Sequence, residues 1–203
     1  MEHYFTHSPT SKETLMEITE RIRGRQVQFR TSRGVFSRQR VDFGTKLLTE
    51  SVRIAPGNWL LDVGCGYGVI GITLSFFCQY VVLLDVNERA CRLARENAVL
   101  NRSENAVVLC GTPSCMKPMF DVVVMNPPIR AGKKAVFTLI SQGKQLLNPS
   151  GAFYIVARTK QGAKSIFSYL EEEFSHADYV ALKGGYRVMA AAERTNVARS
   201  CSD

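Results

Sequence analysis

The sequence lacks several features that define membrane, secreted and metal-dependent proteins. It has no run of about 18 apolar residues, and its first twenty residues contain no apolar signal-peptide core. The six cysteines form no Cys-x-x-Cys pair, and most of them lie in apolar stretches. We therefore expect neither a disulfide framework nor a zinc site. These absences predict a soluble, cytoplasmic protein without a membrane segment or a metal.

Acidic residues are outnumbered, and one segment has none. The chain carries 26 Lys and Arg against 18 Asp and Glu, for a net charge of +8. The acid-free segment between residues 21 and 41 holds Arg21, Arg23, Arg25, Arg30, Arg33, Arg38 and Arg40. Because neutralising phosphates drives nucleic-acid binding, this balance favours a polyanionic partner. The segment predicts either a basic N-terminal surface that contacts phosphates or the solvated edge of a hairpin.

The remaining composition is that of a globular domain. With 203 residues, of which 45% are hydrophobic, the chain can bury a full core as one domain. We predict a single domain over residues 1–194, with a hairpin and a helix in 1–55 and a sheet in 56–194. Residues 1–14 are predicted to form a loose arm, and residues 195–203 a disordered tail.

Short apolar runs alternate with amphipathic segments along the chain. Strands are predicted at residues 16–22, 26–31, 59–63, 81–85, 106–110, 120–125, 152–157, 179–182 and 187–192. Helices are predicted at residues 41–52, 69–77, 88–100, 133–147 and 163–174, with a turn at 148–151. The connection between the last two strands is too short for a crossover helix, so this pair must be antiparallel. The pattern predicts an α/β, Rossmann-like fold: a seven-stranded, mostly parallel sheet with an antiparallel last strand, helices on both faces and a small N-terminal hairpin.

A glycine-rich loop follows the strand at residues 59–63. Gly66, Gly68 and Gly71 satisfy the dinucleotide fingerprint G-x-G-x-x-G, and Asp85 stands where a ribose-binding acid is expected. A dehydrogenase that binds a dinucleotide is therefore one interpretation. The charge of Asp62 opposes it, because a carboxylate there repels a pyrophosphate and suits an ammonium-bearing ligand. Asp85 could otherwise be an acid in a strand-end turn.

The run from Leu60 to Gly68 resembles the D-x-G-x-G-x-G motif of S-adenosylmethionine-dependent methyltransferases. The resemblance implies that the glycines line the amino-acid part of the cofactor and that Asp85 binds the ribose hydroxyls. Such enzymes place an acid near the adenine amino group, whereas this chain has Thr112 or a backbone carbonyl at that place. The cofactor contacts implied by the resemblance are Asp62, Gly64, Cys65, Gly66, Gly68, Asp85, Val86, Thr112 and Asn126.

The predicted strand at residues 120–125 ends in Asn126-Pro127-Pro128. Two prolines end the strand and restrict the asparagine, which predicts a rigid ledge beside the glycine loop rather than a plain connecting loop. The motif resembles the Asp/Asn-Pro-Pro motif of enzymes that methylate the amino groups of adenine, guanine or glutamine amides. The resemblance implies that Asn126, Pro127 and Pro128 form the catalytic site, where Asn126 Oδ1 and the Pro127 carbonyl hold the acceptor NH2. Many nucleic-acid enzymes follow Pro-Pro with an aromatic residue, whereas this chain has Ile129.

Residues 34–48, 126–133 and 183–188 together resemble the catalytic domain of RsmC-type ribosomal RNA guanine-N2 methyltransferases, in a single-domain form. The resemblance implies a lid over the cofactor that includes Phe36 and Asp42. It further implies that RNA is the partner and guanine N2 the acceptor. The residues expected to bind the substrate are Ile129, Arg130, Lys133, Arg38 and Tyr186, with Phe36 or Tyr186 stacking on the base.

Other hypotheses remain open from the sequence. The acceptor could be another RNA base, a protein glutamine or a small amine, in which case the basic face is incidental. The segment from Arg130 to Lys134 could be the solvated start of a helix. A cofactor-binding module without enzyme activity is disfavoured because Asn126-Pro127-Pro128 is intact.

Overall fold

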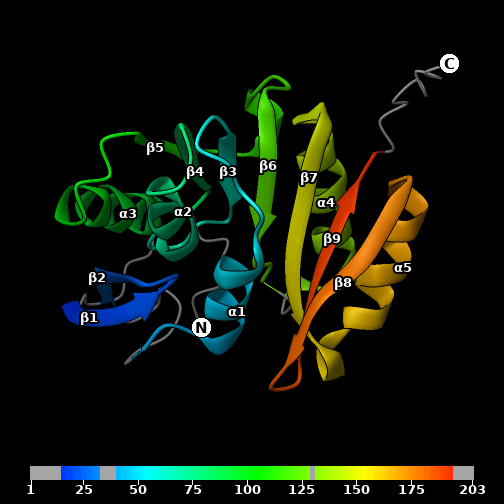
Figure 1. Ribbon diagram of the computed structural model, residues 1–203, viewed down its shortest axis with the longest axis horizontal. Helices are drawn as coiled ribbons and strands as arrows, with labels where there is room; N and C mark the ends of the chain where they lie inside the picture. The colour runs from blue at the N-terminus through cyan, green and yellow to red at the C-terminus, as the bar shows by residue number, and fades with distance from the viewer. Residues whose placement is uncertain (1–14, 33–39, 129–130, 194–203) are drawn as a thin grey trace, which may run out of the picture.

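The computed structural model describes residues 15–32, 40–128 and 131–193 (Figure 1). Its main element is a seven-stranded sheet in the order β5-β4-β3-β6-β7-β9-β8. The strands are β3 (Trp59–Val63), β4 (Tyr80–Asp85), β5 (Ala106–Cys110), β6 (Phe120–Met125), β7 (Leu147–Arg158), β8 (His176–Lys183) and β9 (Tyr186–Ala192). The pairs from β5 to β7 are parallel, and β9 runs antiparallel to both of its neighbours. The predicted fold class is confirmed.

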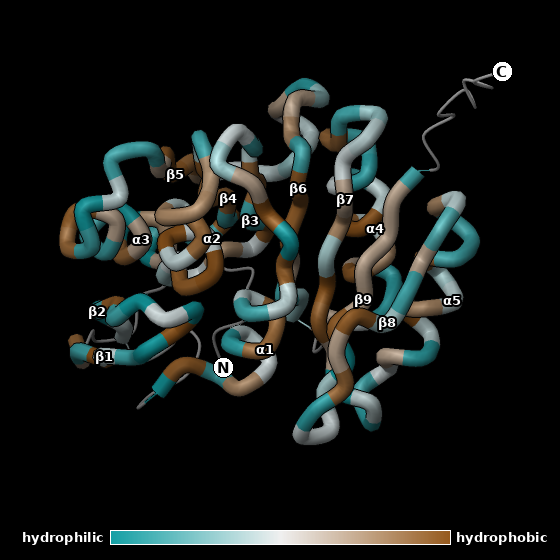
Figure 2. The backbone as a smooth tube through the Cα atoms, in the orientation of Figure 1, coloured by the Kyte–Doolittle hydropathy of each residue, from teal (hydrophilic) through white to brown (hydrophobic). Residues whose placement is uncertain are grey.

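Helices cover both faces of this sheet. On one face lie α1 (Phe43–Ser51), α2 (Val69–Ser75) and α3 (Glu88–Leu100), which pack against residues such as Leu60 and Val124. On the other face lie α4 (Lys133–Lys144) and α5 (Ala163–Glu173), packed against residues such as Leu61 and Val123. Successive strand residues therefore contribute to opposite cores, which explains why the inner strands are apolar throughout. Figure 2 shows the apolar segments gathered in the central strands and in α2.

A separate hairpin is formed by β1 (Leu15–Ile22) and β2 (Arg25–Ser32). Its two-residue turn uses Arg23 and Gly24, both with positive φ, as tight hairpin turns require. Two asparagines of α3 bind the free edge of β2. Asn97 Oδ1 accepts from Arg30 N at 2.6 Å and its Nδ2 donates to Arg30 O at 2.9 Å. Asn101 bonds in the same way to both backbone groups of Gln28. The side chains thus replace a neighbouring strand.

Four predicted element properties are wrong in detail. The apolar sequence of β5 predicts a buried strand, but the strand is half-exposed because it forms the edge of the sheet. The second helix ends at Ser75, and α4 ends at Lys144. The predicted turn at residues 148–151 lies inside β7, at a register shift against β6. Asn148 Nδ2 donates to Asp121 Oδ1 at 2.9 Å, which holds this stretch alongside β6 despite its turn-like composition.

Membrane-spanning helices and clusters of metal ligands are both absent from the residues that the structure describes. None of the helices in these ranges is long and apolar enough to cross a membrane. Across the same ranges, no group of three or more His, Cys, Asp or Glu is placed to hold a metal ion.

Candidate active site

The glycine loop connects β3 to α2 at the carboxyl end of the sheet. Gly64, Gly66 and Gly68 all have positive φ, a region that other residues rarely adopt. Gly68 also has no room for a side chain, because an added Cβ would lie 2.6 Å from Ile72 Cδ1. The amide of Gly64 donates to Leu84 O at 2.8 Å, which ties the loop to β4. The loop is therefore shaped by its glycines, as the sequence predicts.

Asp62 lies beneath this loop and is fully buried. Its Oδ2 accepts from Gly71 N at 2.9 Å, whereas its Oδ1 has no partner among the described residues. Burial raises the pKa of the Asp62 carboxyl to about 7, although the Gly71 amide opposes the shift. The negative charge of Asp62, on which the sequence argument against a pyrophosphate relies, is therefore only partly present at neutral pH. The Asp62–Gly71 bond joins β3 to α2, the two elements that the loop connects.

Asp85 ends β4 beside the loop and is 2% exposed. Its Oδ2 accepts from Gly66 N and its Oδ1 from Asn87 N, both at 2.9 Å. The carboxylate thus fixes the glycine loop and the start of α3 together.

The other predicted cofactor residues also follow the carboxyl ends of the strands. Cys65 is buried, and burial raises the pKa of its thiol well above its usual value, so it stays protonated. Val86 follows Asp85 directly and is half-buried. Thr112 is exposed after β5, where its Oγ1 lies 2.7 Å from Ser114 Oγ.

Asn126 stands at the end of β6, next to β3 and its glycine loop. Its Nδ2 donates to Thr45 Oγ1 of α1 at 2.8 Å, whereas its Oδ1 accepts no hydrogen bond from the described residues. Pro127 is buried and Pro128 half-buried, so the ledge is held in the fold. The side chain is thus oriented by a hydroxyl from the opposite side of the site.

Asp42 caps α1 and links it to the last strand. Its Oδ2 accepts from Thr45 N at 3.2 Å, and Tyr186 donates its hydroxyl to Asp42 Oδ1 at 2.9 Å. The Tyr186 ring leaves no room for a side chain on Gly44, since an added Cβ would lie 2.5 Å from Cε1. The Arg158 guanidinium lies over the same ring, 4.8 Å from its centroid. Tyr186 therefore orders the start of α1, a role that was not predicted from the sequence.

Several predicted residues lie outside the described ranges: Phe36, Arg38, Ile129 and Arg130. Lys133 is described, exposed and in the first turn of α4. Two arginines of the hairpin, which was predicted to contact phosphates, make contacts within the protein itself. Arg23 donates to Val52 O at 2.7 Å, and Arg30 pairs with Glu17 at 3.1 Å.

Two residues of this region were missed by sequence reasoning. Thr45 was passed over because a threonine in an amphipathic helix has no distinguishing pattern. Asn97 was missed for a similar reason, although it is fully buried and its Nδ2 also donates to Tyr67 O in the glycine loop, at 2.8 Å. A polar residue on the apolar face of a helix was the available signal, since buried amides need partners.

Comparison with known proteins places this arrangement in a family. A family model described as "Methyltransferase small domain" matches residues 26–190. The chain is 38% identical to the uncharacterised protein YbxB of Bacillus subtilis, over 94% of this chain and 98% of that protein. It is 32% identical to ribosomal RNA small subunit methyltransferase C of Cronobacter sakazakii, over 84% of this chain and 51% of that protein.

A solved structure shares the fold. The 16S rRNA N2 G1207 methyltransferase RsmC of T. thermophilus, in complex with AdoMet and guanosine, superimposes with a TM-score of 0.81 at 24% identity. The match covers 92% of this chain and 52% of that one. The chain thus spans about half the length of the RsmC proteins that it matches. The family model covers most of the domain, from the hairpin to β9, and the chain belongs to the methyltransferase small domain family.

Proposed function

We propose that this protein transfers a methyl group from S-adenosylmethionine to an exocyclic amino nitrogen, namely N2 of guanine in ribosomal RNA. The observation that carries the proposal is the orientation of Asn126. Its NH2 group is bound to Thr45 Oγ1, so its Oδ1 is available to accept a hydrogen bond from an amino group.

The chemistry of an amino acceptor fits this arrangement. An exocyclic amino nitrogen is a poor nucleophile, because its lone pair is delocalised into the ring. Two acceptors, Asn126 Oδ1 and the Pro127 carbonyl, draw the nitrogen toward a tetrahedral geometry and direct its lone pair at the methyl donor. As positive charge develops on the nitrogen, both dipoles bind it more strongly, which lowers the barrier. The C–N bond forms as the methyl–sulfur bond breaks, which releases S-adenosylhomocysteine, and the methylated nitrogen then loses one proton to solvent. Positioning of the amino group therefore takes the place of a strong base in this step.

The loop and its surroundings fit S-adenosylmethionine. The positive-φ glycines bring the backbone into a tight turn at the sheet edge, where ligands of parallel sheets bind. Asp85 ends β4 beside this loop, and its carboxylate is the acceptor-only group that ribose hydroxyls can donate to. S-adenosylmethionine supplies an activated methyl group on a sulfonium, and the protein residues hold and orient it. Membership of the family supports this assignment.

Ribosomal RNA is supported as the substrate by two observations. The net charge of +8 suits a polyanion. RsmC proteins, named for ribosomal RNA methylation, match this chain over most of its length. A base within a duplex must be unstacked and turned into the site before its amino group reaches Asn126.

Two measurements test the proposal. Isothermal titration with S-adenosylhomocysteine and with NAD tests the cofactor, and a preference for NAD would exclude methyl transfer. Tritiated methyl from labelled cofactor is then followed onto deproteinised ribosomal RNA, assembled subunits, tRNA and protein. Label on ribosomal RNA is expected. Label only on protein would instead indicate a glutamine acceptor.

A further inference from the structure

A groove lies between α4 and α5, on the face of the sheet opposite the hairpin. It consists of two adjoining hollows of about 580 and 320 Å³, which share Lys133, Phe137 and Tyr169. We call it the α4–α5 groove. Its other lining residues include Lys134, Lys164 and one acidic residue, Glu172, near the far end of α5.

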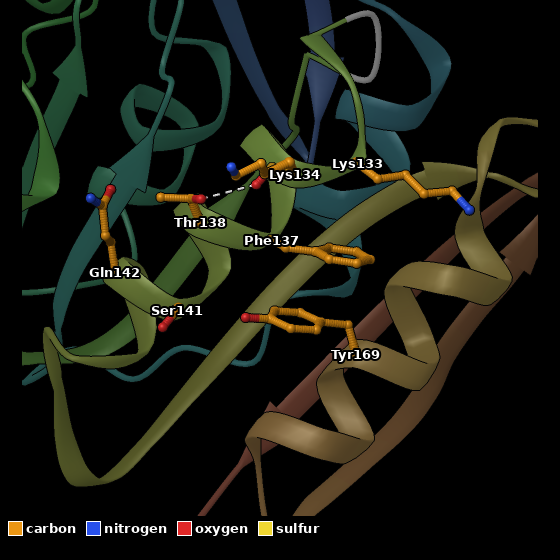
Figure 3. A pocket seen from close by; sticks show the side chains of 7 residues that line it. All are labelled: Lys133, Lys134, Phe137, Thr138, Ser141, Gln142 and Tyr169. Atoms are coloured by element: carbon orange, nitrogen blue, oxygen red, sulfur yellow. Dashed lines mark hydrogen bonds between the residues drawn. The ribbon is translucent and has the colours of Figure 1, made fainter.

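Two aromatic rings form the floor of the groove. Phe137 and Tyr169 stack with their centroids 4.1 Å apart and their planes within 5°. Both are half-buried against the core below, so part of each ring stays accessible. Figure 3 shows the pair lying between the two helices, below the lysines. Because the two rings cover each other's facing surfaces, a nucleic-acid base can stack on the outer face of one ring or pack against the exposed edges of the pair.

The upper rim is basic. Lys133 and Lys134 lie in the first turn of α4, and Lys164 in the first turn of α5. All three are exposed, and within the described ranges none of them pairs with a carboxylate. Figure 3 shows Lys133 reaching toward the start of α5, and it lines the same hollow as Lys164.

This placement of charge is unfavourable for the helices themselves. The N-terminus of a helix carries partial positive charge, so cations there oppose its dipole. Neither α4 nor α5 has an acidic residue in its first turn, and α5 ends in three glutamates at its negative end. Helix stability therefore does not explain these lysines, and a basic helix N-terminus is a place where an anion can bind.

The basic rim and the acceptor site both lie at the carboxyl ends of the parallel strands. β6 and β7 are parallel neighbours, and α4 and α5 begin after their carboxyl ends. Asn126 also stands at the carboxyl end of β6. An RNA strand whose target base is held at Asn126 can therefore continue over the rim into the groove.

We infer that the α4–α5 groove binds the single-stranded RNA that flanks the methylated nucleotide. Phosphates contact Lys133 and Lys164, and a neighbouring base rests on Phe137 and Tyr169. This inference rests on the proposed function, because it assigns a second binding surface to the same RNA substrate. It extends the substrate contacts to the far side of the sheet.

The test measures binding of a labelled single-stranded RNA of about 12 nucleotides by fluorescence anisotropy at several salt concentrations. The double variant Lys133→Gln/Lys164→Gln removes two charges from the rim. We expect its affinity to fall about tenfold or more, and the slope of log K against log salt to fall by about 1.4. The control Arg53→Gln/Lys117→Gln removes two exposed charges from segments that precede β3 and β6, away from Asn126. It should change the slope far less.

A second variant separates stacking from charge. Phe137→Leu/Tyr169→Leu should weaken RNA binding about tenfold but leave the salt slope unchanged, since it removes no ionic contact. Unchanged affinity for S-adenosylhomocysteine shows that the variant is folded.

The outcomes are distinguishable. If the wild type binds the RNA but both groove variants bind like the control, the inference is wrong and the proposed function stands. If the wild type binds no RNA at low ionic strength, both the proposal of an RNA substrate and the inference about the groove are wrong. Equal binding of polyglutamate would show that the groove selects charge alone, which also contradicts the inference.

Discussion

The side chain of Asn126 donates a hydrogen bond from Nδ2 to Thr45 Oγ1 over 2.8 Å. The two residues come from β6 and α1 and are far apart in the sequence. In this arrangement the donor end of the Asn126 amide faces Thr45, and the acceptor end, Oδ1, faces away from it. Thr45 is therefore a positioning residue for the proposed reaction.

Replacing Thr45 with valine keeps the shape of the side chain but removes the hydroxyl. Asn126 then loses the partner that orients it, and we expect turnover to fall about tenfold, as for loss of one hydrogen bond to a positioned group. The KM for RNA and the affinity for S-adenosylhomocysteine should change little. Thr45→Ser restores a hydroxyl and should recover most of the turnover. A valine variant as active as the wild type would show that Asn126 is oriented without Thr45.

Replacing Asp85 with alanine should act mainly on cofactor binding. The substitution removes the proposed ribose acceptor and frees the amides of Gly66 and Asn87. We expect the Kd of S-adenosylhomocysteine, measured by isothermal titration, to rise about a hundredfold, as for loss of hydrogen bonds to a charged group. Asp178→Ala, which changes an exposed carboxylate on β8, is the matched control. If Asp85→Ala binds S-adenosylhomocysteine as tightly as the wild type, Asp85 does not contact the cofactor.

Asn97 and Asn101 offer a paired test of how the hairpin is held. Asn97→Ala leaves three buried or part-buried backbone groups without their partner. We expect it to lower the free energy of unfolding by roughly 3 kcal/mol. Asn101→Ala acts at the exposed end of the same contact and should cost roughly 1 kcal/mol. Urea denaturation compares them, and equal losses would contradict the assigned difference in burial.

Asp62 should make stability depend on pH. Its pKa in the folded protein is about 7, against an ordinary value of 3.8, because burial disfavours the charged carboxylate. With the folded pKa raised, the native state binds more protons than the unfolded state between these values. Stability from this group is therefore fully present below pH 4 and is lost as the pH rises through 7. Between pH 8 and 5.5 the gain should be roughly 2 kcal/mol.

The variant Asp62→Asn isolates this contribution, since it cannot titrate. Denaturation of both proteins across the same pH range should show a steeper dependence in the wild type. Parallel curves would show that Asp62 keeps an ordinary pKa in the folded protein.

Much of the fold was predictable because the local signals agree. The strands β3, β4 and β6 are apolar on both faces, and the Arg23-Gly24 turn supplies the positive φ of a tight hairpin. The exceptions come from tertiary contacts. Residues 148–151 look like a turn, but the Asn148 bond to Asp121 places them in β7.

The site was predictable where backbone conformation requires a residue type. The positive-φ glycines and the Asn-Pro-Pro ledge are of this kind. The partners that orient Asn126 and Asp42 were not predictable, since Thr45 and Tyr186 reach them from other elements. Likewise, the raised pKa of Asp62 results from burial, which cannot be predicted from the spacing of residues in the motif.

The central claim is methylation of an amino nitrogen held by Asn126. Its most direct test is nucleoside mass spectrometry of ribosomal RNA after incubation with isotope-labelled S-adenosylmethionine and either the wild type or Asn126→Ala. The account predicts labelled N2-methylguanosine with the wild type. With the variant it predicts at least roughly a hundredfold less, at nearly unchanged affinity for S-adenosylhomocysteine. Label on a ring nitrogen, a carbon or a ribose oxygen, or full activity of Asn126→Ala, would contradict it.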